Sequence, residues 1–158
     1  YFYKIKQKVD VAIFRPFNVF GPGMPKNDYR VFPRFFSSIK NRRPITIFKN
    51  GKQTRTFCYV SDAITAMFLV IIKGNKFVYN IGTDGPEVNM SVLHKKIEKS
   101  IGKKVKSINI SYPKNYPQVE PQRRCPDITK IKRELNFKNR VSLIESIKRF
   151  YSWSSQYY

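Results

Sequence analysis

Apolar residues recur along the chain in short runs, separated by Pro, Gly and charged residues. Runs that are continuously apolar, or that alternate with polar residues, predict strands over 9–14, 45–48, 56–60, 77–82 and 105–111. Apolar residues at helical spacing predict helices over 32–41, 63–73, 91–101, 128–135 and 142–153. Strands mixed with helices in this way are typical of an α/β fold.

Some of these segments also carry signals for their ends and their burial. Ser61 and Asp62 precede the helix over 63–73 and are expected to cap it. That helix is apolar on nearly every face, which predicts deep burial. The strand over 9–14 is also expected to be buried, with neighbours on both faces of a sheet. Residues 112–126 contain four prolines and are expected to form a loop.

The composition is strongly basic. The 158 residues include 31 Lys and Arg against 10 Asp and Glu, a formal net charge of +21. Such a charge suits nucleic acid, because phosphate neutralisation dominates that kind of binding. The positive residues are spread over the whole chain, however, without zinc-finger spacing or an aromatic RNA-binding motif. We therefore expect no specific nucleic-acid partner.

Several other site types are not expected. The longest apolar run, 63–72, is too short to span a bilayer, so no membrane insertion is expected. Cys58 and Cys125 lack the paired spacing of zinc sites and disulfide scaffolds, which favours a reducing, cytoplasmic compartment. The one histidine, His94, is expected to be a solvated helix residue. Without a glycine-rich phosphate loop or a carboxylate pair, the sequence predicts neither a metal site nor a self-contained catalytic site.

Two segments carry residues suited to an anionic ligand. The first, 15–23, follows the strand over 9–14, and ligands in open α/β sheets bind beyond the carboxyl ends of strands, where Asn18 would lie. The second, 53–62, places Arg55 just ahead of an extended segment, where a guanidinium can bind a diphosphate. From the residues alone, Asn18 could equally satisfy a turn and Arg55 could be a solvated surface charge.

Four segments resemble, in order and approximate spacing, motifs of the extended short-chain dehydrogenases that modify nucleotide sugars. They are 17–22 (FNVFGP), 55–62 (RTFCYVSD), 79–82 (YNIG) and 123–130 (RRCPDITK). Residues 27–31, 53–55 and 122–127 most resemble the UDP-glucuronate decarboxylase branch. The resemblance implies the C-terminal half of an enzyme of the NAD-dependent epimerase/dehydratase family.

The implied fold is the C-terminal part of an NAD(P)-binding Rossmann-like sheet together with a small α/β substrate-binding domain. Residues 1–82 would supply the last strands and helix of the Rossmann-like domain, with a substrate-binding segment at about 17–58 interleaved. Residues 83–158 would form a nucleotide-sugar-binding subdomain. In the family the dinucleotide loop and the catalytic YxxxK pair lie earlier in the chain. No catalytic residue is therefore expected in this chain, and those groups are expected upstream of Tyr1.

The implied reaction is decarboxylation of UDP-glucuronate through NAD-dependent oxidation of the sugar at C4. The partner would be a UDP-sugar, NAD would be bound mainly by the missing half, and the full-length enzyme would be a homodimer. The chain itself would be a fragment or a truncated gene product, inactive alone. Alternatives are the corresponding half of a nucleotide-sugar 4-epimerase or 4,6-dehydratase, a degenerate remnant, and a basic non-catalytic binding module.

The resemblance also implies individual contacts. The substrate-binding residues would be Tyr3, Asn18, Arg30, Phe48, Gln53, Arg55 and Arg124, and the backbone of Val19 would touch the nicotinamide end of NAD. Phe48 would stack on the base, while Arg55 and Arg124 would bracket the diphosphate. Phe48 is also a candidate for the plain apolar core, and Arg124, like most arginines, could be a solvated charge.

Overall fold

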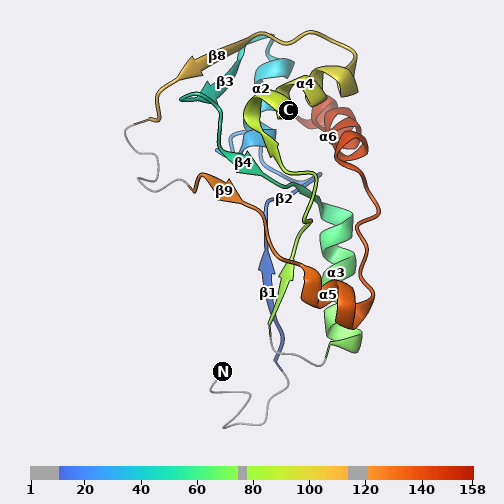
Figure 1. The fold of residues 1–158 in the computed structure, drawn as a ribbon. Coiled ribbons are helices and arrows are strands. Elements are labelled where there is room, and N and C mark those ends of the chain that lie inside the picture. Colours follow the sequence, from blue (N-terminus) through green and yellow to red (C-terminus); the bar gives the residue numbers. More distant parts are fainter. Residues whose placement is uncertain (1–10, 75–77, 114–120) are drawn as a thin grey trace.

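The lower half of the molecule in Figure 1 is built on a parallel strand pair and two helices. The computed structural model describes residues 11–74, 78–113 and 121–158. Strand β1 (Ile13–Pro16) pairs with β6 (Val78–Ile81), and α3 (Val60–Lys73) and α5 (Thr129–Leu135) pack beside β6. The core of this half includes Ala66, Val70, Tyr79, Ile81, Ile131 and Phe137.

The upper half packs three helices beside a second parallel strand pair. Its elements are α2 (Val31–Lys40), β3 (Ile45–Phe48), α4 (Met90–Ile101), β8 (Ser107–Ile110) and α6 (Leu143–Tyr157). The rings of Phe20 and Phe32 stack with centroids 3.6 Å apart, and Phe150 meets both at steep angles. Because aromatic rings bury large apolar areas, this cluster holds α2 and α6 together.

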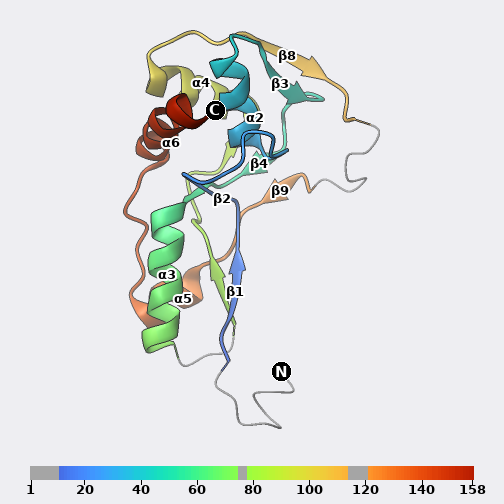
Figure 2. The same ribbon diagram turned by 180° about the vertical axis from the view of Figure 1, so that it is seen from behind.

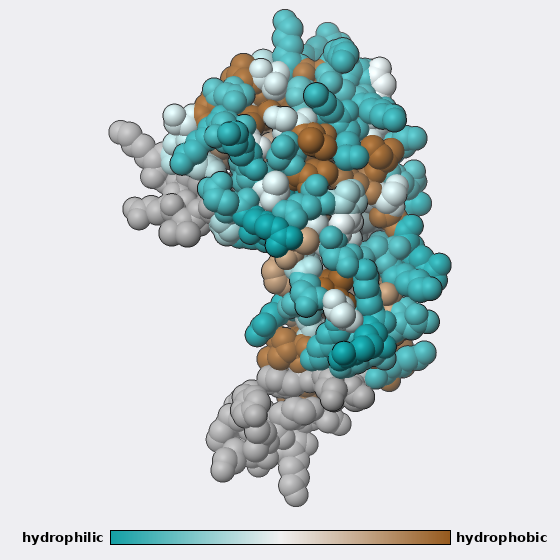
Figure 3. All heavy atoms as spheres, in the orientation of Figure 1, coloured by the Kyte–Doolittle hydropathy of each residue, from teal (hydrophilic) through white to brown (hydrophobic). Residues whose placement is uncertain are grey.

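Short strands join the two halves. They are β2 (Val19–Phe20), β4 (Thr54–Arg55), β5 (Cys58–Tyr59), β7 (Val88–Asn89) and β9 (Arg123–Arg124). Strand β2 pairs in parallel with β5, while β4 lies between antiparallel β7 and parallel β9. Segments far apart in the sequence therefore meet at this junction, which Figure 2 shows from behind. The space-filling outline narrows between the broad upper half and the lower half (Figure 3).

The α/β fold expected from the sequence pattern is confirmed, and most elements lie close to their expected positions. Strand β3 covers the expected 45–48, and α2 begins one residue before the expected helix. The expected strand over 9–14 falls partly outside the described residues, and its described part, β1, continues to Pro16. The expected loop over 112–126 contains the short strand β9, because its backbone completes the ladder of β4.

The expected deep burial of α3 is wrong. Ile64, Phe68, Ile71 and Ile72 follow one another at helical spacing and are 46%, 59%, 65% and 72% exposed. Strand β1 is not buried either, since Ile13 is 38% exposed. The apolar composition of a helix indicates that its faces would be stabilised by burial. It does not show that other residues of this chain bury them. In the described part of the chain, only the opposite side of α3 is packed.

Two polar side chains hold loops in place rather than acting as the sequence predicted. Asp62 does not cap α3: its buried carboxylate accepts hydrogen bonds from the backbone N–H groups of Arg140 (3.0 Å) and Val141 (3.1 Å). It thereby ties the segment before α6 to the start of α3. His94 is not a solvated residue, since its side chain is 15% exposed and its Nε2 lies 2.8 Å from the carbonyl oxygen of Val105.

Replacing Asp62 by Ala is expected to lower the free energy of unfolding by about 1–3 kcal/mol, because two part-buried N–H groups lose their acceptor. Ser61→Ala is the matched control, since Ser61 is exposed and its expected change is within about 0.5 kcal/mol. Urea denaturation followed by circular dichroism measures both variants. Equally small changes in the two would contradict the role given to Asp62.

Candidate functional site

A cavity of about 170 Å³ lies at the junction of the two halves. Its walls come from β2, α2, β3, β4 and β9 and from the loops beside them. The described residues expected to contact substrate or cofactor all line it: Asn18, Val19, Arg30, Phe48, Gln53, Arg55 and Arg124. The remaining one, Tyr3, lies outside the described residues. Motifs that are far apart in the sequence thus converge on one place in the structure.

Asn18 fastens the turn between β1 and β2 to two other segments. Its backbone φ of 46° lies in the left-handed region, which Asn tolerates better than most residues. The side-chain amide donates hydrogen bonds to the carbonyl oxygens of Thr56 (2.8 Å) and Arg124 (3.2 Å). Within the described part of the chain, its side-chain oxygen accepts no hydrogen bond. That oxygen is therefore available to a donor on a ligand.

Two guanidinium groups come from directly paired positions of β4 and β9. Arg55 and Arg124 are register partners, so their side chains leave the same face of the strand pair. Arg55 is buried, and its Nη1 donates to the carbonyl oxygens of Thr54 (2.8 Å) and Gln122 (3.4 Å). Arg124 is exposed. None of the described residues that line the cavity is acidic, so these two groups make its wall positive.

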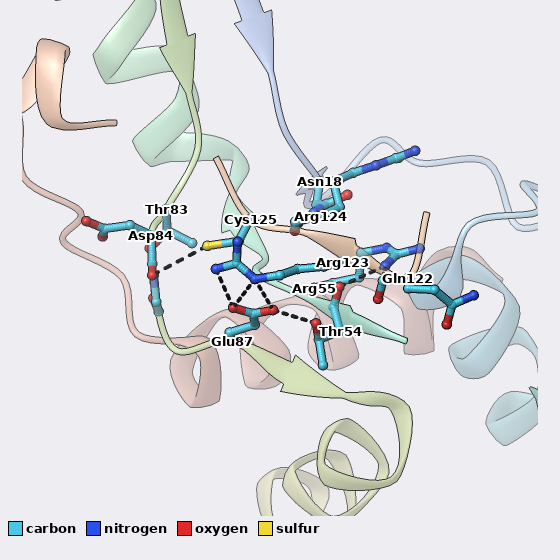
Figure 4. A network of polar contacts seen from close by, with 11 residues as sticks. Asn18, Thr54, Arg55, Thr83, Asp84, Glu87, Gln122, Arg123, Arg124 and Cys125 are labelled. Atoms are coloured by element: carbon cyan, nitrogen blue, oxygen red, sulfur yellow. Dashed lines mark hydrogen bonds and ion pairs between the residues drawn. The ribbon is translucent and has the colours of Figure 1, made fainter. Parts of the chain in front are cut away.

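Glu87 holds β9 and β4 together, and we call its contacts the Glu87 clamp (Figure 4). Its carboxylate accepts hydrogen bonds from the Thr54 hydroxyl and from Arg123, whose Nε lies 3.0 and 3.1 Å from the two oxygens and whose Nη2 lies 2.9 Å from one. The bonds from Thr54 and then Arg123 hold the pKa of Glu87 below its usual value, so it is charged at neutral pH. Because Thr54 and Arg123 directly precede Arg55 and Arg124, the clamp holds together the two strands from which both guanidinium groups project.

The wall beside β3 is both aromatic and cationic. Phe48 is buried, and the Arg34 guanidinium lies 4.0 Å from its ring centroid, close enough for a cation–π contact. The ring of Tyr112 lies 5.0 Å from that of Phe48. Arg34 also donates from Nη2 to the carbonyl oxygen of Thr46 at 3.1 Å, which fixes it over β3. Phe48 is thus at once a core residue and part of the cavity wall.

Arg30 stands at the start of α2 with its charge balanced locally. Its Nη2 lies 2.5 Å from Oδ2 of Asp28, and its Nε lies 3.0 Å from both oxygens of that carboxylate. The side-chain hydrogen bond from Arg30 lowers the pKa of Asp28. Gln53, half-buried, lines the cavity just before β4.

Other residues of the site were given no role in the sequence analysis. Those with a wall or clamp position are Met24, Tyr29, Arg34, Phe57, Glu87 and Met90. For Arg34 there was a signal, because it interrupts the run of phenylalanines in the expected helix. Glu87 had none, since its partners lie 33 and 36 positions away.

The described residues contain no group of three or more His, Cys, Asp or Glu side chains that could hold a metal ion. No helix among them combines the length and apolar content needed to cross a membrane. Cys58 lies in the lower core, and burial raises the pKa of its thiol to about 12. It therefore stays protonated at neutral pH and is a poor nucleophile.

Known proteins match this chain over most of its length. Residues 3–82 match the NAD dependent epimerase/dehydratase family. UDP-glucuronic acid decarboxylase 1 of Arabidopsis thaliana is 34% identical over 144 residues, which are 91% of this chain and 32% of that protein. UDP-N-acetyl-alpha-D-glucosaminuronate decarboxylase of Bacillus cytotoxicus is 32% identical over 151 residues, which are 93% of this chain and 47% of that protein.

Solved structures show the same fold. UDP-glucuronic acid 4-epimerase from Bacillus cereus, in complex with UDP-glucuronic acid and NAD, has a TM-score of 0.85 at 27% identity, covering 99% of this chain and 48% of that one. UDP-glucose 4-epimerase from Thermotoga maritima, with UDP-glucose, has a TM-score of 0.88 at 25% identity, covering 99% and 49%.

This chain spans about a third to a half of the length of these relatives. The similarity of fold confirms the expected Rossmann-like architecture of extended short-chain dehydrogenases. The family match covers the segments that build β1, β2, α2, β3, β4, β5, α3 and β6. The chain belongs to the NAD dependent epimerase/dehydratase family.

Proposed function

We propose that the junction cavity binds the nucleoside diphosphate of a UDP-sugar, and that the chain is the substrate-binding part of an NAD-dependent enzyme resembling UDP-glucuronate decarboxylase. The observation that carries this proposal is the convergence of seven residues, named through the family resemblance and distant from one another in the sequence, on one cavity whose described lining contains no acidic residue. The relatives that match are UDP-sugar enzymes by name, which supports the same class of ligand.

The chemistry of the wall suits the two ends of UDP. Arg55 and Arg124 offer charge-assisted hydrogen bonds from neighbouring strands to the diphosphate. Arg55 is fixed by burial and by its carbonyl partners, so little side-chain entropy is lost when an anion binds. Phe48 and Arg34 offer a ring and a planar cation to the base. The free side-chain oxygen of Asn18 would accept a hydrogen bond from a sugar hydroxyl rather than donate to phosphate.

The residues present fit NAD at one point. Val19 lines the cavity beside Asn18, and its backbone is fixed by the pairing of β2 with β5, so the nicotinamide end can approach it beyond the carboxyl end of β1. When bound, NAD would take a hydride from C4 of the sugar and later return it. This chain's residues would bind and orient the substrate for that step.

The two parts of the chain would have different roles. We propose that residues 1–82 belong to the dinucleotide-binding domain, with 17–58 interleaved as a substrate segment, and that 83–158 form the nucleotide-sugar subdomain. The catalytic groups would lie outside the 158 residues, since the sequence contains no glycine-rich dinucleotide loop and no YxxxK pair. The whole enzyme would be a cytoplasmic homodimer.

Arg124→Ala is expected to weaken UDP binding by roughly 10- to 150-fold, because it removes a charge-assisted interaction of about 1.5–3 kcal/mol. Isothermal titration calorimetry of the full 158-residue chain measures it. Arg133→Ala is the control with the same change of charge, since Arg133 is exposed on α5, away from the cavity. An unchanged affinity in Arg124→Ala would count against the diphosphate site.

Glu87→Gln is expected to weaken UDP binding although Glu87 does not line the cavity, because Arg123 loses its ionic partner and β9 is held less firmly. Glu145→Gln removes a comparable exposed ion pair with Arg149 and should leave UDP affinity unchanged. The lowered pKa of Glu87 also predicts that the clamp is complete at neutral pH and is lost as pH falls through that pKa. Equal UDP affinities in the two variants would exclude a positioning role.

The 158 residues alone are expected to bind UDP but to give no turnover of UDP-glucuronate with NAD. Nuclear magnetic resonance of the sugar signals distinguishes decarboxylation from 4-epimerisation. Either product formed by the purified chain would place catalytic groups within it. A product found only with the full-length enzyme would decide between the decarboxylase and the epimerase reaction.

A further inference from the structure

A second hollow, of about 460 Å³, lies where the C-terminal ends of α2, α4 and α6 meet. Six of the described residues that line it are cationic: Lys40, Arg42, Arg43, Lys103, Lys104 and Lys106. None of its described lining residues is acidic. It shares no lining residue with the junction cavity, so a ligand here would contact none of the residues that line that cavity.

The cationic residues stand on two loops whose backbones are tied to each other and to the helices. The N–H of Ile45 donates to the carbonyl oxygen of Lys106 at 2.9 Å, which joins the loop after α2 to the loop after α4. The N–H of Arg43 donates to the carbonyl oxygen of Ser38 at 2.9 Å. The N–H of Val105 donates to Glu98 Oε1 at 2.9 Å. The positive charges are therefore brought together by fixed backbone.

Three of these six cations have a hydrogen-bond or ion-pair partner within the chain. Lys40 donates to the carbonyl oxygen of Ser155 at the end of α6, where a cation also offsets the helix dipole. Lys104 lies 3.7 Å from a carboxylate oxygen of Glu98. Lys103 lies 3.5 Å from the hydroxyl of Tyr151.

The other three cations are uncompensated. Within the described part of the chain, the side chains of Arg42, Arg43 and Lys106 make no hydrogen bond or ion pair. Arg42 is moreover held in the left-handed region, with φ of 54°. Like charges gathered around one hollow repel one another, and an anion placed between them removes that cost.

Apart from Tyr151, Ser154 and Ser155, the other described residues that line the hollow are apolar. They include Phe36, Ile39, Pro44, Ile101 and Val105. A volume of about 460 Å³ falls within the range of roughly 300–1,000 Å³ that is typical of small-molecule sites. Cationic and apolar lining residues around one hollow suit a ligand that carries several phosphates and a ring system.

We propose that this hollow is a binding site for an organic polyphosphate, specifically a nucleoside triphosphate. Arg42, Arg43 and Lys106 would bind the phosphates, and a guanidinium group can make bidentate contacts with a phosphate. The base would cover the apolar wall. A concave hollow of this size favours a small ligand over a nucleic-acid duplex, which would require a cationic face extending beyond it.

The test is calorimetric titration of the full chain with ATP and, separately, with inorganic tripolyphosphate at physiological salt. The combined variant Arg42→Gln, Arg43→Gln and Lys106→Gln is expected to weaken ATP binding at least tenfold. The combined control Lys95→Gln, Lys138→Gln and Lys148→Gln loses the same charge at exposed positions outside the hollow and should change ATP affinity less than twofold. Equal losses in the two variants would overturn the site and show diffuse attraction only.

Three further comparisons distinguish this proposal from its alternatives. ATP is expected to bind more tightly than tripolyphosphate, and equal affinities would overturn the contact between base and apolar wall. Arg124→Ala should leave ATP affinity unchanged, and a loss would move ATP to the junction cavity. Displacement of ATP by random-sequence duplex DNA, with a steep salt dependence, would overturn the small-ligand proposal in favour of nucleic acid.

Discussion

The pairing of β4 with β9 is the contact on which the junction cavity depends. These strands are two residues each, too short to be stable by their ladder alone, and they come from distant parts of the sequence. What fixes them is polar: the Glu87 clamp on one side and the amide of Asn18 on the other. The Asn18 amide donates to the backbone carbonyl of Arg124, and Glu87 binds the side chain of the preceding residue, Arg123. The backbone position from which the guanidinium of Arg124 projects is therefore set before any ligand arrives.

This arrangement explains why one residue can serve the fold and the site together. The side-chain amide of Asn18 donates hydrogen bonds to the carbonyl oxygens of Thr56 and Arg124. Replacing Asn18 would therefore disturb β9 as well as the ligand contact. Phe48 is similar, since it is buried in the upper half and also faces the cavity. If substitution of either residue weakened ligand binding, the loss could not be assigned to the ligand contact rather than to a change in the fold. Arg124 and Glu87 are the more informative positions, because the first is exposed and the second lies outside the cavity.

Much of the fold and of the cavity could be predicted from the sequence, and the failures have common physical reasons. Helix and strand periods located α2, β3 and α6, because local apolar spacing and packing coincide there. The family resemblance identified the seven cavity residues. The cation over Phe48 and the partners of Asp62 depend on contacts between segments that no local pattern encodes. The prediction that α3 is deeply buried was wrong for another reason. The composition of a helix describes its own faces but does not show which element packs against each face.

The net charge of +21 does not by itself locate a binding site. The positions of the few acidic residues determine which cations are paired and which are not. Asp28 balances Arg30, and Glu87 balances Arg123, both beside the junction cavity. Their pairing leaves the cavity wall with Arg55 and Arg124 directed at one place, which is a condition for recognising a diphosphate rather than any anion. At the second hollow the acids are almost absent, and three cations stay uncompensated among the described residues. The same basic composition thus produces a narrow cavity beside which carboxylates pair with Arg30 and Arg123, and a broad hollow in which three cations have no such partner among the described residues.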